Sequence, residues 1–301
     1  MVTATEPLPA PTADLDEARA HLDTWGYCLV KDALSPDEVG ALRRRLIEQA
    51  SGEAAAGLGR FDDGAFVSRH GRVGGPNQRV VNLLNKGEIF QVVPQKPAVQ
   101  ALIEHVLGER FLLSSFSANI AGPGGQAQEL HQDQGYVPHP QPVYSCVADV
   151  AWFLDDVDEA NGGTRVVPGS HRWEERLPLG EWRPSVAGAG PAGTAMVIPG
   201  RTYHGTGANV SNRWRHVLLT NFCRVFVRQQ ENPFLGLAPE VRAALSPAMR
   251  RLLGFRVYGS LGGVENGRSY CDEHGYVHVP SRYLRALSAD GCPLETNQPN
   301  G

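Results

Sequence analysis

The stretch Tyr144-Ser-Cys-Val-Ala-Asp-Val-Ala-Trp-Phe153 decides the fold, because it is an almost unbroken run of apolar and small residues. A run of this length bounded by turn residues predicts a strand that is buried on both faces. Asn-Gly-Gly at 161–163 and Pro-Gly-Ser at 168–170 follow it and predict tight turns. We therefore expect the sequence around this strand to build the core of a β fold.

Further stretches between residues 111 and 227 predict strands that are separated by turns rich in Gly, Pro and Asn. The chain contains 34 Gly and 22 Pro and only 8% aromatic residues, which favours a β architecture over a helix bundle. The additional predicted strands are Phe111–Ile120, Gln128–Gln132, Thr164–Val167, Thr194–Ile198 and His216–Val227.

Helical patterns precede most of these strands. Residues 15–25 place their apolar side chains on one helical face, and Tyr27–Val30 is predicted as a short buried strand. Ser35-Pro-Asp-Glu38 is a capping box with Pro at the first helical position, which predicts a helix through about Gln49. Another helix is expected over Pro97–Leu107. The sequence therefore predicts a mainly β fold with flanking helices.

We expect a single domain over residues 14–290. Residues 1–13 are rich in Pro, Ala and Thr and are predicted to form a disordered arm, and residues 291–301 a flexible tail. Residues 51–78 have little periodicity and predict a long surface loop. Loops of that length are often lids or binding loops, so we expect 51–78 and 238–287 to close over a bound molecule.

Charge and cysteine usage exclude several classes of partner. The 28 basic and 32 acidic residues are well mixed, so a nucleic-acid partner is not expected. The five cysteines include no Cys-x-x-Cys, which predicts neither a disulfide framework nor a zinc knuckle. There is no signal-peptide pattern and no apolar run of about 18 residues. We therefore expect a cytoplasmic protein without a membrane partner, and the oligomeric state is not predicted.

A pair of candidate metal ligands lies in Leu130-His131-Gln-Asp133. On a strand, residues two apart point to the same face, so His131 and Asp133 can converge on one ion. His204 follows a Pro-Gly turn and precedes Gly-x-Gly, a constrained loop that suits a third ligand. Two His and one carboxylate on one face of an octahedral ion leave open positions, which suits ferrous iron.

Each of these residues also has a less specific interpretation. A His-x-Asp pair occurs often by chance, as a surface His beside a turn Asp. His171, in Pro-Gly-Ser-His, is an alternative third ligand, although a turn imidazole more often bonds the backbone. The Gln residues around His131 favour a functional site, because a polar strand in a core needs partners.

An arginine follows the third candidate ligand at a useful distance. Arg215 lies eleven residues beyond His204 at the start of the next predicted strand. A guanidinium near a metal can hold a carboxylate through two parallel hydrogen bonds. Arg213 is a competitor on the same face, and we interpret it as a solvated surface residue instead.

Taken together, these segments resemble the phytanoyl-CoA dioxygenase-like branch of the Fe(II)/2-oxoglutarate oxygenases. The resemblance covers roughly residues 22–227 and rests on the following segments: Gly26-Tyr-Cys-Leu-Val, Leu34-Ser-Pro-Asp-Glu, Leu130-His-Gln-Asp-Gln, Trp152-Phe-Leu-Asp-Asp-Val-Asp-Glu-Ala-Asn-Gly-Gly-Thr-Arg-Val-Val-Pro-Gly-Ser-His171, and His204-Gly-x-Gly with Arg215. The presence of Asp133 argues against a related halogenase, in which a small residue replaces the carboxylate.

The resemblance implies a double-stranded β-helix core, which is a cupin-like jelly roll. It implies Fe(II) held by His131, Asp133 and His204, with 2-oxoglutarate as co-substrate and O₂ as oxidant. The expected products are succinate, CO₂ and an oxidised substrate. Arg215 would anchor the distal carboxylate of 2-oxoglutarate.

Four other positions match residues near 2-oxoglutarate in the family. Gln128 and Thr164 match positions that help to hold the co-substrate, although Gln128 could simply pair with a strand edge and Thr164 could shape its turn. Trp152 matches a nearby position in some relatives, and plain core packing is an equal alternative. Arg79 is expected to contribute from the side.

The expected function is oxidation, chiefly hydroxylation, of a small organic molecule such as a natural-product intermediate. A non-enzymatic metal-binding jelly-roll sensor is an alternative, but a sensor of another ligand has no need of Arg215. An oxygenase acting on an acyl-CoA is a further alternative that rests on the family name alone. A zinc hydrolase would need a positioned general base, and no His-Glu-x-x-His occurs.

Overall fold

The computed structural model describes residues 7–65, 74–178, 180–263 and 292 of the chain. It forms two compact units, residues 1–245 and 246–301. The first unit carries both β-sheets and every residue proposed for the site. The second unit contains the helix α7 (Pro247–Leu252) among its described residues. The single domain expected over 14–290 stays a prediction, as do the tail and the lids.

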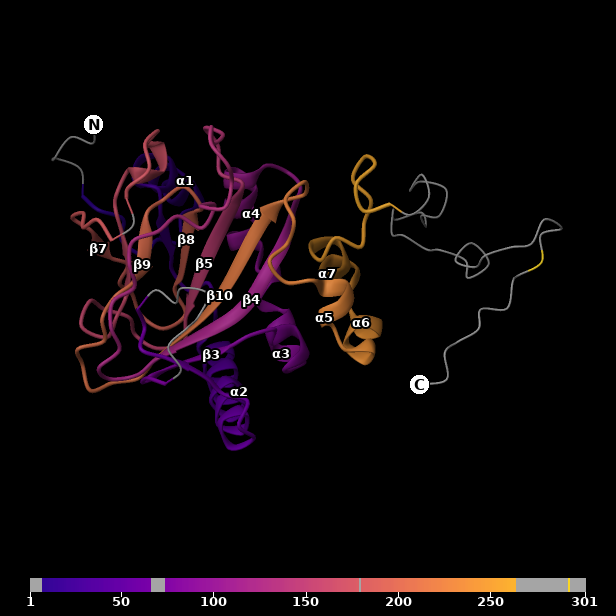
Figure 1. Ribbon diagram of the computed structural model, residues 1–301, viewed down its shortest axis with the longest axis horizontal. Coiled ribbons are helices and arrows are strands. Elements are labelled where there is room, and N and C mark those ends of the chain that lie inside the picture. Colours follow the sequence, from indigo (N-terminus) through magenta and orange to yellow (C-terminus); the bar gives the residue numbers. More distant parts are fainter. Residues whose placement is uncertain (1–6, 66–73, 179, 264–291, 293–301) are drawn as a thin grey trace. The chain divides into compact units, whose positions relative to one another are not determined.

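Two antiparallel sheets form the first unit (Figure 1). The larger has seven strands in the order β1-β8-β5-β10-β4-β3-β2, and the smaller has three in the order β7-β6-β9. The larger sheet consists of β1 (Cys28–Val30), β2 (Arg60–Asp62), β3 (Asn77–Val80), β4 (Phe111–Ala121), β5 (Val147–Phe153), β8 (Ala195–Pro199) and β10 (Arg215–Arg224). The smaller consists of β6 (Thr164–Val166), β7 (Val186–Ala187) and β9 (His204–Thr206).

The core lies between these sheets. Phe153 on β5 and Val217 on β10 pack in one cluster with Val166 of the smaller sheet. Because side chains alternate along a strand, every second residue of β5 and β10 faces this interior. The central position of β5, between β8 and β10, explains why its sequence is apolar on both faces. The strand begins at Val147, three residues later than predicted.

Helices cover the outer face of the larger sheet. The helix α4 (Pro97–Leu107) contacts β4, β5, β8 and β10, and α1 (Leu15–Trp25) packs beside it. The helix α2 (Pro36–Ala55) opens with the predicted capping box between Ser35 and Glu38. The remaining short helices of the first unit are η1 (Leu83–Asn85), α3 (Glu88–Gln91), η2 (Val93–Gln95), η3 (Ser170–Arg172), α5 (Pro233–Gly236) and α6 (Pro239–Ala244). The mainly β fold with flanking helices is confirmed.

Two predicted elements differ from the structure. The segment Gln128–Gln132 is not a regular strand. Between two successive hydrogen bonds to β9, this segment contributes three residues whereas β9 contributes two. Gln128 N donates to Thr206 O at 2.8 Å and His131 N donates to His204 O at 2.9 Å, so an extra residue bulges between these rungs. Only an isolated bridge between His131 and His204 remains.

The predicted loop 51–78 contains regular structure at both ends. The helix α2 continues to Ala55, because alanine and glutamate there sustain a helix that buries Leu46 and Ala50. The strands β2 and β3 then form the edge of the larger sheet. Residues 66–73 lie outside the described part of the chain. The N-terminal arm is tied down near its end, since Thr12 N donates to Leu29 O at 3.0 Å.

Candidate metal centre

The three predicted metal ligands lie close together where β9 of the smaller sheet pairs with the segment that precedes Asp133. The Nε2 atom of His131 lies 3.4 Å from Oδ1 of Asp133, and Nε2 of His204 lies 3.6 Å from Oδ2 of the same carboxylate. One ligand atom from each residue falls within 4.8 Å of the others, a spacing at which all three could hold one metal ion. The structure therefore brings the three predicted ligands together.

Backbone pairing sets the geometry of this site. His131 and His204 exchange two main-chain hydrogen bonds of 2.9 and 3.0 Å, which places their side chains next to each other. Asp133 lies in the turn that begins just after this bridge. The prediction that the ligands converge is therefore right in outcome, but the same-strand reason is wrong, because a bridge followed by a turn replaces the strand.

The orientation of each imidazole is fixed by a carbonyl two residues before it. His131 Nδ1 lies 2.9 Å from Glu129 O, and His204 Nδ1 lies 3.0 Å from Thr202 O. An Nδ1–H that donates to a carbonyl leaves the lone pair on Nε2. In both rings Nε2 is the nitrogen that faces Asp133, so each histidine presents a metal-binding lone pair to the centre.

The charges of the three ligands suit a divalent metal. Burial opposes ionisation of Asp133, but the two histidines, His204 foremost, hold the pKa of this carboxyl well below its usual range. Burial lowers the pKa of His204. Burial also opposes protonation of His131, but Asp133 outweighs it and raises the pKa of this imidazole. One carboxylate and two imidazoles are the ligand set expected of non-haem ferrous iron.

A further acid, Asp149, lies against Asp133 on the inward face of β5. Burial and then the negative charge of Asp133 raise the pKa of Asp149 well above its usual value. Asn221 Nδ2 donates to Asp149 Oδ1 at 2.6 Å. In its protonated form, Asp149 can donate a hydrogen bond to Asp133 and so orient it. The sequence analysis missed Asp149, although an acid inside an apolar strand is itself a clue, because its burial requires partners.

The predicted carboxylate anchor lies inside the same fold. Arg215 is the first residue of β10 and is only 1% exposed. Its Nε and Nη2 atoms have no hydrogen-bond partner among the described residues. Burial lowers the pKa of this guanidinium to about 10, which leaves it charged at neutral pH. A buried, charged group with unused donors is costly unless a ligand supplies the acceptors.

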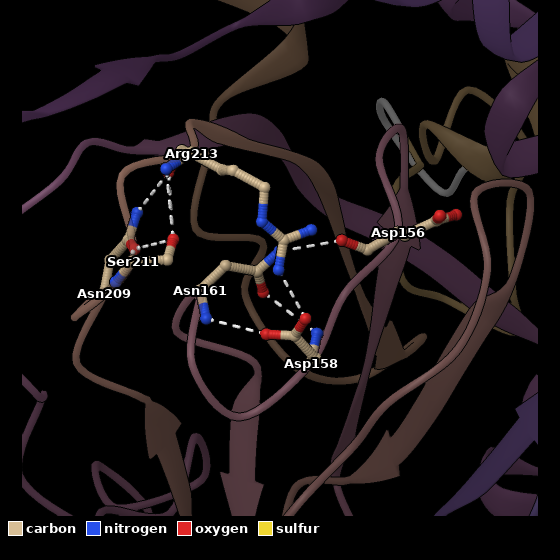
Figure 2. A network of polar contacts seen from close by, with 6 residues as sticks. All are labelled: Asp156, Asp158, Asn161, Asn209, Ser211 and Arg213. Carbon is tan, nitrogen blue, oxygen red and sulfur yellow. Dashed lines mark hydrogen bonds and ion pairs between the residues drawn. The ribbon is translucent and has the colours of Figure 1, made fainter.

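The competing arginine, Arg213, occupies a different environment. Its side chain is half exposed and forms an ion pair of 2.5 Å with Asp158, as Figure 2 shows. Exposed pairs of this kind contribute little to stability. The two arginines thus differ in exposure as predicted: Arg213 is solvated at the surface, and Arg215 is buried.

The interior near Arg215 is lined by polar residues of both sheets. Thr164 of β6 is paired with Thr206 of β9, and both share the inward face of the smaller sheet with His204. Asn119 of β4 spans the core, since its Nδ2 donates to Thr206 Oγ1 at 3.3 Å while its Oδ1 has no partner among the described residues. The sequence analysis missed Asn119 and Thr206. For Thr206 a clue was available, because it lies two residues after His204.

The other predicted co-substrate residues occupy three different settings. Gln128 Oε1 accepts a hydrogen bond from Thr206 N at 3.2 Å, so this side chain does pair with a strand edge next to the site. Arg79 faces the interior opposite Asn119, and its Nε donates to Asp62 at 3.1 Å. Its positive charge acts on both His131 and Arg215.

Trp152 lies on the opposite face of the larger sheet. Its neighbours on β10 are Leu218 and Thr220, whereas the inward residues are Val217 and Leu219. Its indole Nε1 donates to Thr220 Oγ1 at 2.9 Å. The structure therefore does not bring Trp152 to the metal centre, and core packing accounts for it.

His171 is also accounted for without a metal. Its Nε2 lies 3.2 Å from Asp23 O, as expected for a turn imidazole that bonds the backbone. Burial lowers its pKa to about 4. It packs so closely on α1 that a Cβ added at Gly26 would lie 2.3 Å from its Nδ1. His171 thus helps to join η3 to the helix α1.

None of the helices in the described part of the chain combines the length and apolar character of a membrane span.

Comparisons with known proteins agree with this geometry. The family model for phytanoyl-CoA dioxygenase (PhyH) matches residues 22–217. The dioxygenase af480 of Aspergillus fumigatus is 29% identical over 258 residues, which cover 83% of this chain and 82% of that protein. A probable alpha-ketoglutarate-dependent hypophosphite dioxygenase of Stutzerimonas stutzeri is 24% identical over 229 residues, covering 69% of this chain and 77% of that protein.

Solved structures share the fold at lower identity. The epimerase SnoN, solved with Fe³⁺, alpha ketoglutarate and nogalamycin RO, has a TM-score of 0.57 at 20% identity and covers 75% of this chain and 90% of its own. The carbocyclase SnoK from nogalamycin biosynthesis has a TM-score of 0.57 at 20% identity, covering 76% of this chain and 95% of its own. The predicted jelly-roll core is confirmed.

Proposed function

The chain belongs to the phytanoyl-CoA dioxygenase family, and on that premise we propose that it oxidises a small organic molecule at an iron centre formed by His131, Asp133 and His204. It is a non-haem iron dioxygenase that uses 2-oxoglutarate and O₂. The enzyme class follows from the family. The residue roles and the kind of substrate are the proposal.

One observation carries the assignment of the site. A three-residue ligand set and a buried arginine with unused donors occupy the interior of the same two-sheet core. The ligand set fits iron, since two neutral imidazoles and one carboxylate leave coordination positions open. Arg215 fits a carboxylate, since a guanidinium binds one through two parallel hydrogen bonds. A simple metal sensor needs the first feature and has no use for the second.

In this proposal, different residues of the chain bind the metal and the co-substrate. His131, Asp133 and His204 hold the iron, and Asp149 orients Asp133 by hydrogen bonding. Arg215 neutralises the distal carboxylate of 2-oxoglutarate, and its burial excludes water from that ion pair. When bound, ferrous iron supplies O₂ activation, which converts 2-oxoglutarate to succinate and CO₂.

Further side chains complete the co-substrate pocket in this proposal. Thr164 and Thr206 offer hydroxyl groups from the smaller sheet, and Asn119 offers its unpartnered Oδ1 from β4. Gln128 supports the site through Thr206, and Arg79 adds positive charge to the same interior. We assign no role at the site to Trp152.

The substrate is proposed as a natural-product intermediate that undergoes oxidation, chiefly hydroxylation. The support comes from two structural neighbours: SnoK belongs to nogalamycin biosynthesis, and SnoN was solved in complex with nogalamycin RO. The segments at 51–78 and 238–287 are proposed as lids, and parts of both lie outside the described residues. A cytoplasmic location stays a prediction.

Succinate formation tests this function directly. The protein, loaded anaerobically with Fe(II), is given 2-oxoglutarate and then air, with and without a panel of polyketides, terpenoids and acyl-CoA thioesters. We expect succinate that depends on Fe(II) and rises with one class of the panel. Protein that binds iron but forms no succinate under any condition would contradict the enzyme assignment and favour a metal-binding sensor.

A further inference from the structure

The connection between β9 and β10, residues 207–214, joins the third metal ligand to the arginine anchor. At its centre lies Asn209, which is only 1% exposed. Its main chain is held on both sides: Asn209 N donates to Gly125 O, and Gly124 N donates to Asn209 O, each at 2.9 Å. The buried amide side chain therefore has a fixed position from which it can act on its neighbours.

All four hydrogen-bonding positions of the Asn209 amide are used. Its Nδ2 donates to Ala121 O at 3.1 Å and to Arg213 O at 2.8 Å. Its Oδ1 accepts from Ser211 N at 3.1 Å and from Ser211 Oγ at 2.8 Å (Figure 2). An amide offers two donor hydrogens and two acceptor lone pairs, so this side chain is saturated by the loop around it.

The hydrogen bonds donated by Asn209 lie beside the residue pair at which Arg215 begins β10. Ala121, the last residue of β4, is the partner of Arg215 in the β4–β10 register. Arg213, whose carbonyl receives the second Nδ2 hydrogen, lies two residues before Arg215. The Asn209 amide thus ties the end of β4 to the chain that leads into β10.

The same connection reaches the turn that carries Thr164. Gly207 N donates to Gly163 O at 3.1 Å, and Val210 N donates to Ala160 O at 2.9 Å. The packing is close, since a Cβ added at Gly207 would lie 2.7 Å from Gly163 O. Both sides of the proposed co-substrate pocket are therefore attached to residues 207–214.

The guanidinium of Arg215 has little else to hold it. Because its Nε and Nη2 atoms have no partners among the described residues, its direction depends on where the backbone places it. Bidentate binding of a carboxylate requires the two planes to be aligned, so a small backbone shift at Arg215 weakens both hydrogen bonds together.

We propose that Asn209 is a positioning residue for the co-substrate: its buried amide fixes the start of β10 so that Arg215 faces the distal carboxylate of 2-oxoglutarate. This inference rests on the proposed function. It predicts that loss of the Nδ2 donors weakens 2-oxoglutarate binding and leaves iron binding intact, because the metal ligands are fixed separately by the His131–His204 bridge.

Two substitutions of Asn209 and one control separate these effects. Asn209→Asp keeps the shape and the Oδ1 acceptor but places an oxygen against two carbonyls, and Asn209→Ala removes the side chain. The control is Arg213→Gln, which alters the exposed ion pair and leaves the Arg213 carbonyl in place. For each protein the Kd of Fe(II), the Kd of 2-oxoglutarate from the visible absorbance of the anaerobic Fe(II) complex, and Tm are measured.

We expect both Asn209 variants to raise the Kd of 2-oxoglutarate about tenfold or more, since two buried hydrogen bonds are lost. Their Fe(II) affinity, and both constants of the control, should stay within about twofold of the unaltered protein. Where Asn209→Asp fails to fold, Asn209→Ala decides. Unchanged 2-oxoglutarate binding, or equal loss of Fe(II) and 2-oxoglutarate binding, overturns the inference. An unaltered protein without the absorbance change would instead contradict the proposed function.

Discussion

At the scale of single residues, the chemistry depends on hydrogen bonds that select one nitrogen of each histidine. Glu129 O and Thr202 O, each two residues before a ligand, bind the Nδ1 positions and leave Nε2 to face Asp133. Asp133 stays ionised in a buried setting because both histidines surround it. The site is therefore prepared for a divalent ion before the ion arrives.

Removal of the ligand carboxylate should abolish metal binding. Asp133→Ala leaves two imidazoles without the negative charge that balances the metal, so Fe(II) affinity should fall at least about a hundredfold. Succinate formation should be lost with it. Asp156→Ala, at an exposed acid outside the metal centre, is the matched control and should keep both. Equilibrium dialysis with Fe(II), followed by succinate measurement, checks the result, and retained turnover in Asp133→Ala would remove this residue from the centre.

Replacement of the buried arginine should separate co-substrate binding from metal binding. In Arg215→Gln the charged fork is lost, and we expect the KM for 2-oxoglutarate to rise by about a hundredfold, since a buried charge pair contributes roughly 2–5 kcal/mol. Fe(II) binding should persist. Arg213→Gln should leave the KM unchanged because its side chain is half exposed. Equal effects of the two substitutions would show that neither arginine is a specific anchor.

Metal affinity should depend on pH through His131. Only the deprotonated imidazole binds a metal, and Asp133 raises the pKa of His131 above the usual histidine value. Protons therefore compete with the metal, and affinity should fall as pH decreases through that raised pKa. His204 adds little competition, because burial lowers its pKa. Titration with Co(II) between about pH 8 and about pH 5.5 checks this, and affinity that does not decline over that range would contradict it.

Several residue roles could be predicted from the sequence and others could not. The spacing of His131, Asp133 and His204 and the position of Arg215 led to the same cluster that the structure contains. Trp152 and Asp149 could not be assigned, because the choice between the two faces of β5 depends on which neighbours the strand acquires. Only the sheet order shows that Asp149 faces inward and Trp152 outward.

At the scale of elements, local patterns predicted helices better than strand ends. The helix Pro97–Leu107 was predicted at its observed bounds, and the capping box at Ser35 begins α2 as expected. The segment Gln128–Gln132 was wrongly predicted as a strand, because its polar sequence does not reveal the bulge against β9. The helix α2 was predicted to end at about Gln49, but it continues to Ala55, because residues that favour helices follow Gln49.

Replacement of Gly26 and of Gly52 by alanine should change the free energy of unfolding in opposite directions. Gly26 ends α1 at φ 73°, where a Cβ would also lie 2.3 Å from His171 Nδ1, so Gly26→Ala should destabilise the fold by more than about 1 kcal/mol. Gly52 lies within α2 with nothing within 4 Å, so Gly52→Ala should stabilise by about 0.5–1 kcal/mol. Urea unfolding of both variants measures the difference, and destabilisation by Gly52→Ala would refute the assignment of that position as open helix.

At the scale of the whole molecule, the fold gathers residues that are far apart in the chain. Arg79, His131, Thr164, His204 and Arg215 come from five separate segments, and the fold brings them to one interior. Figure 1 shows the two sheets that form this part of the molecule. The fold class could be predicted because its turns and buried strand are local patterns. The lids and the substrate could not, since they depend on contacts made by segments without a periodic pattern.

The central claim is that one interior holds both Fe(II) and 2-oxoglutarate. Its most direct test is an anaerobic titration of the Fe(II)-loaded protein with 2-oxoglutarate, followed by visible absorbance. We predict a weak metal-to-ligand charge-transfer band that saturates at one equivalent, is abolished by Asp133→Ala and requires far more 2-oxoglutarate in Arg215→Gln. Protein that is shown to bind iron and yet develops no band at any concentration of 2-oxoglutarate would contradict the claim.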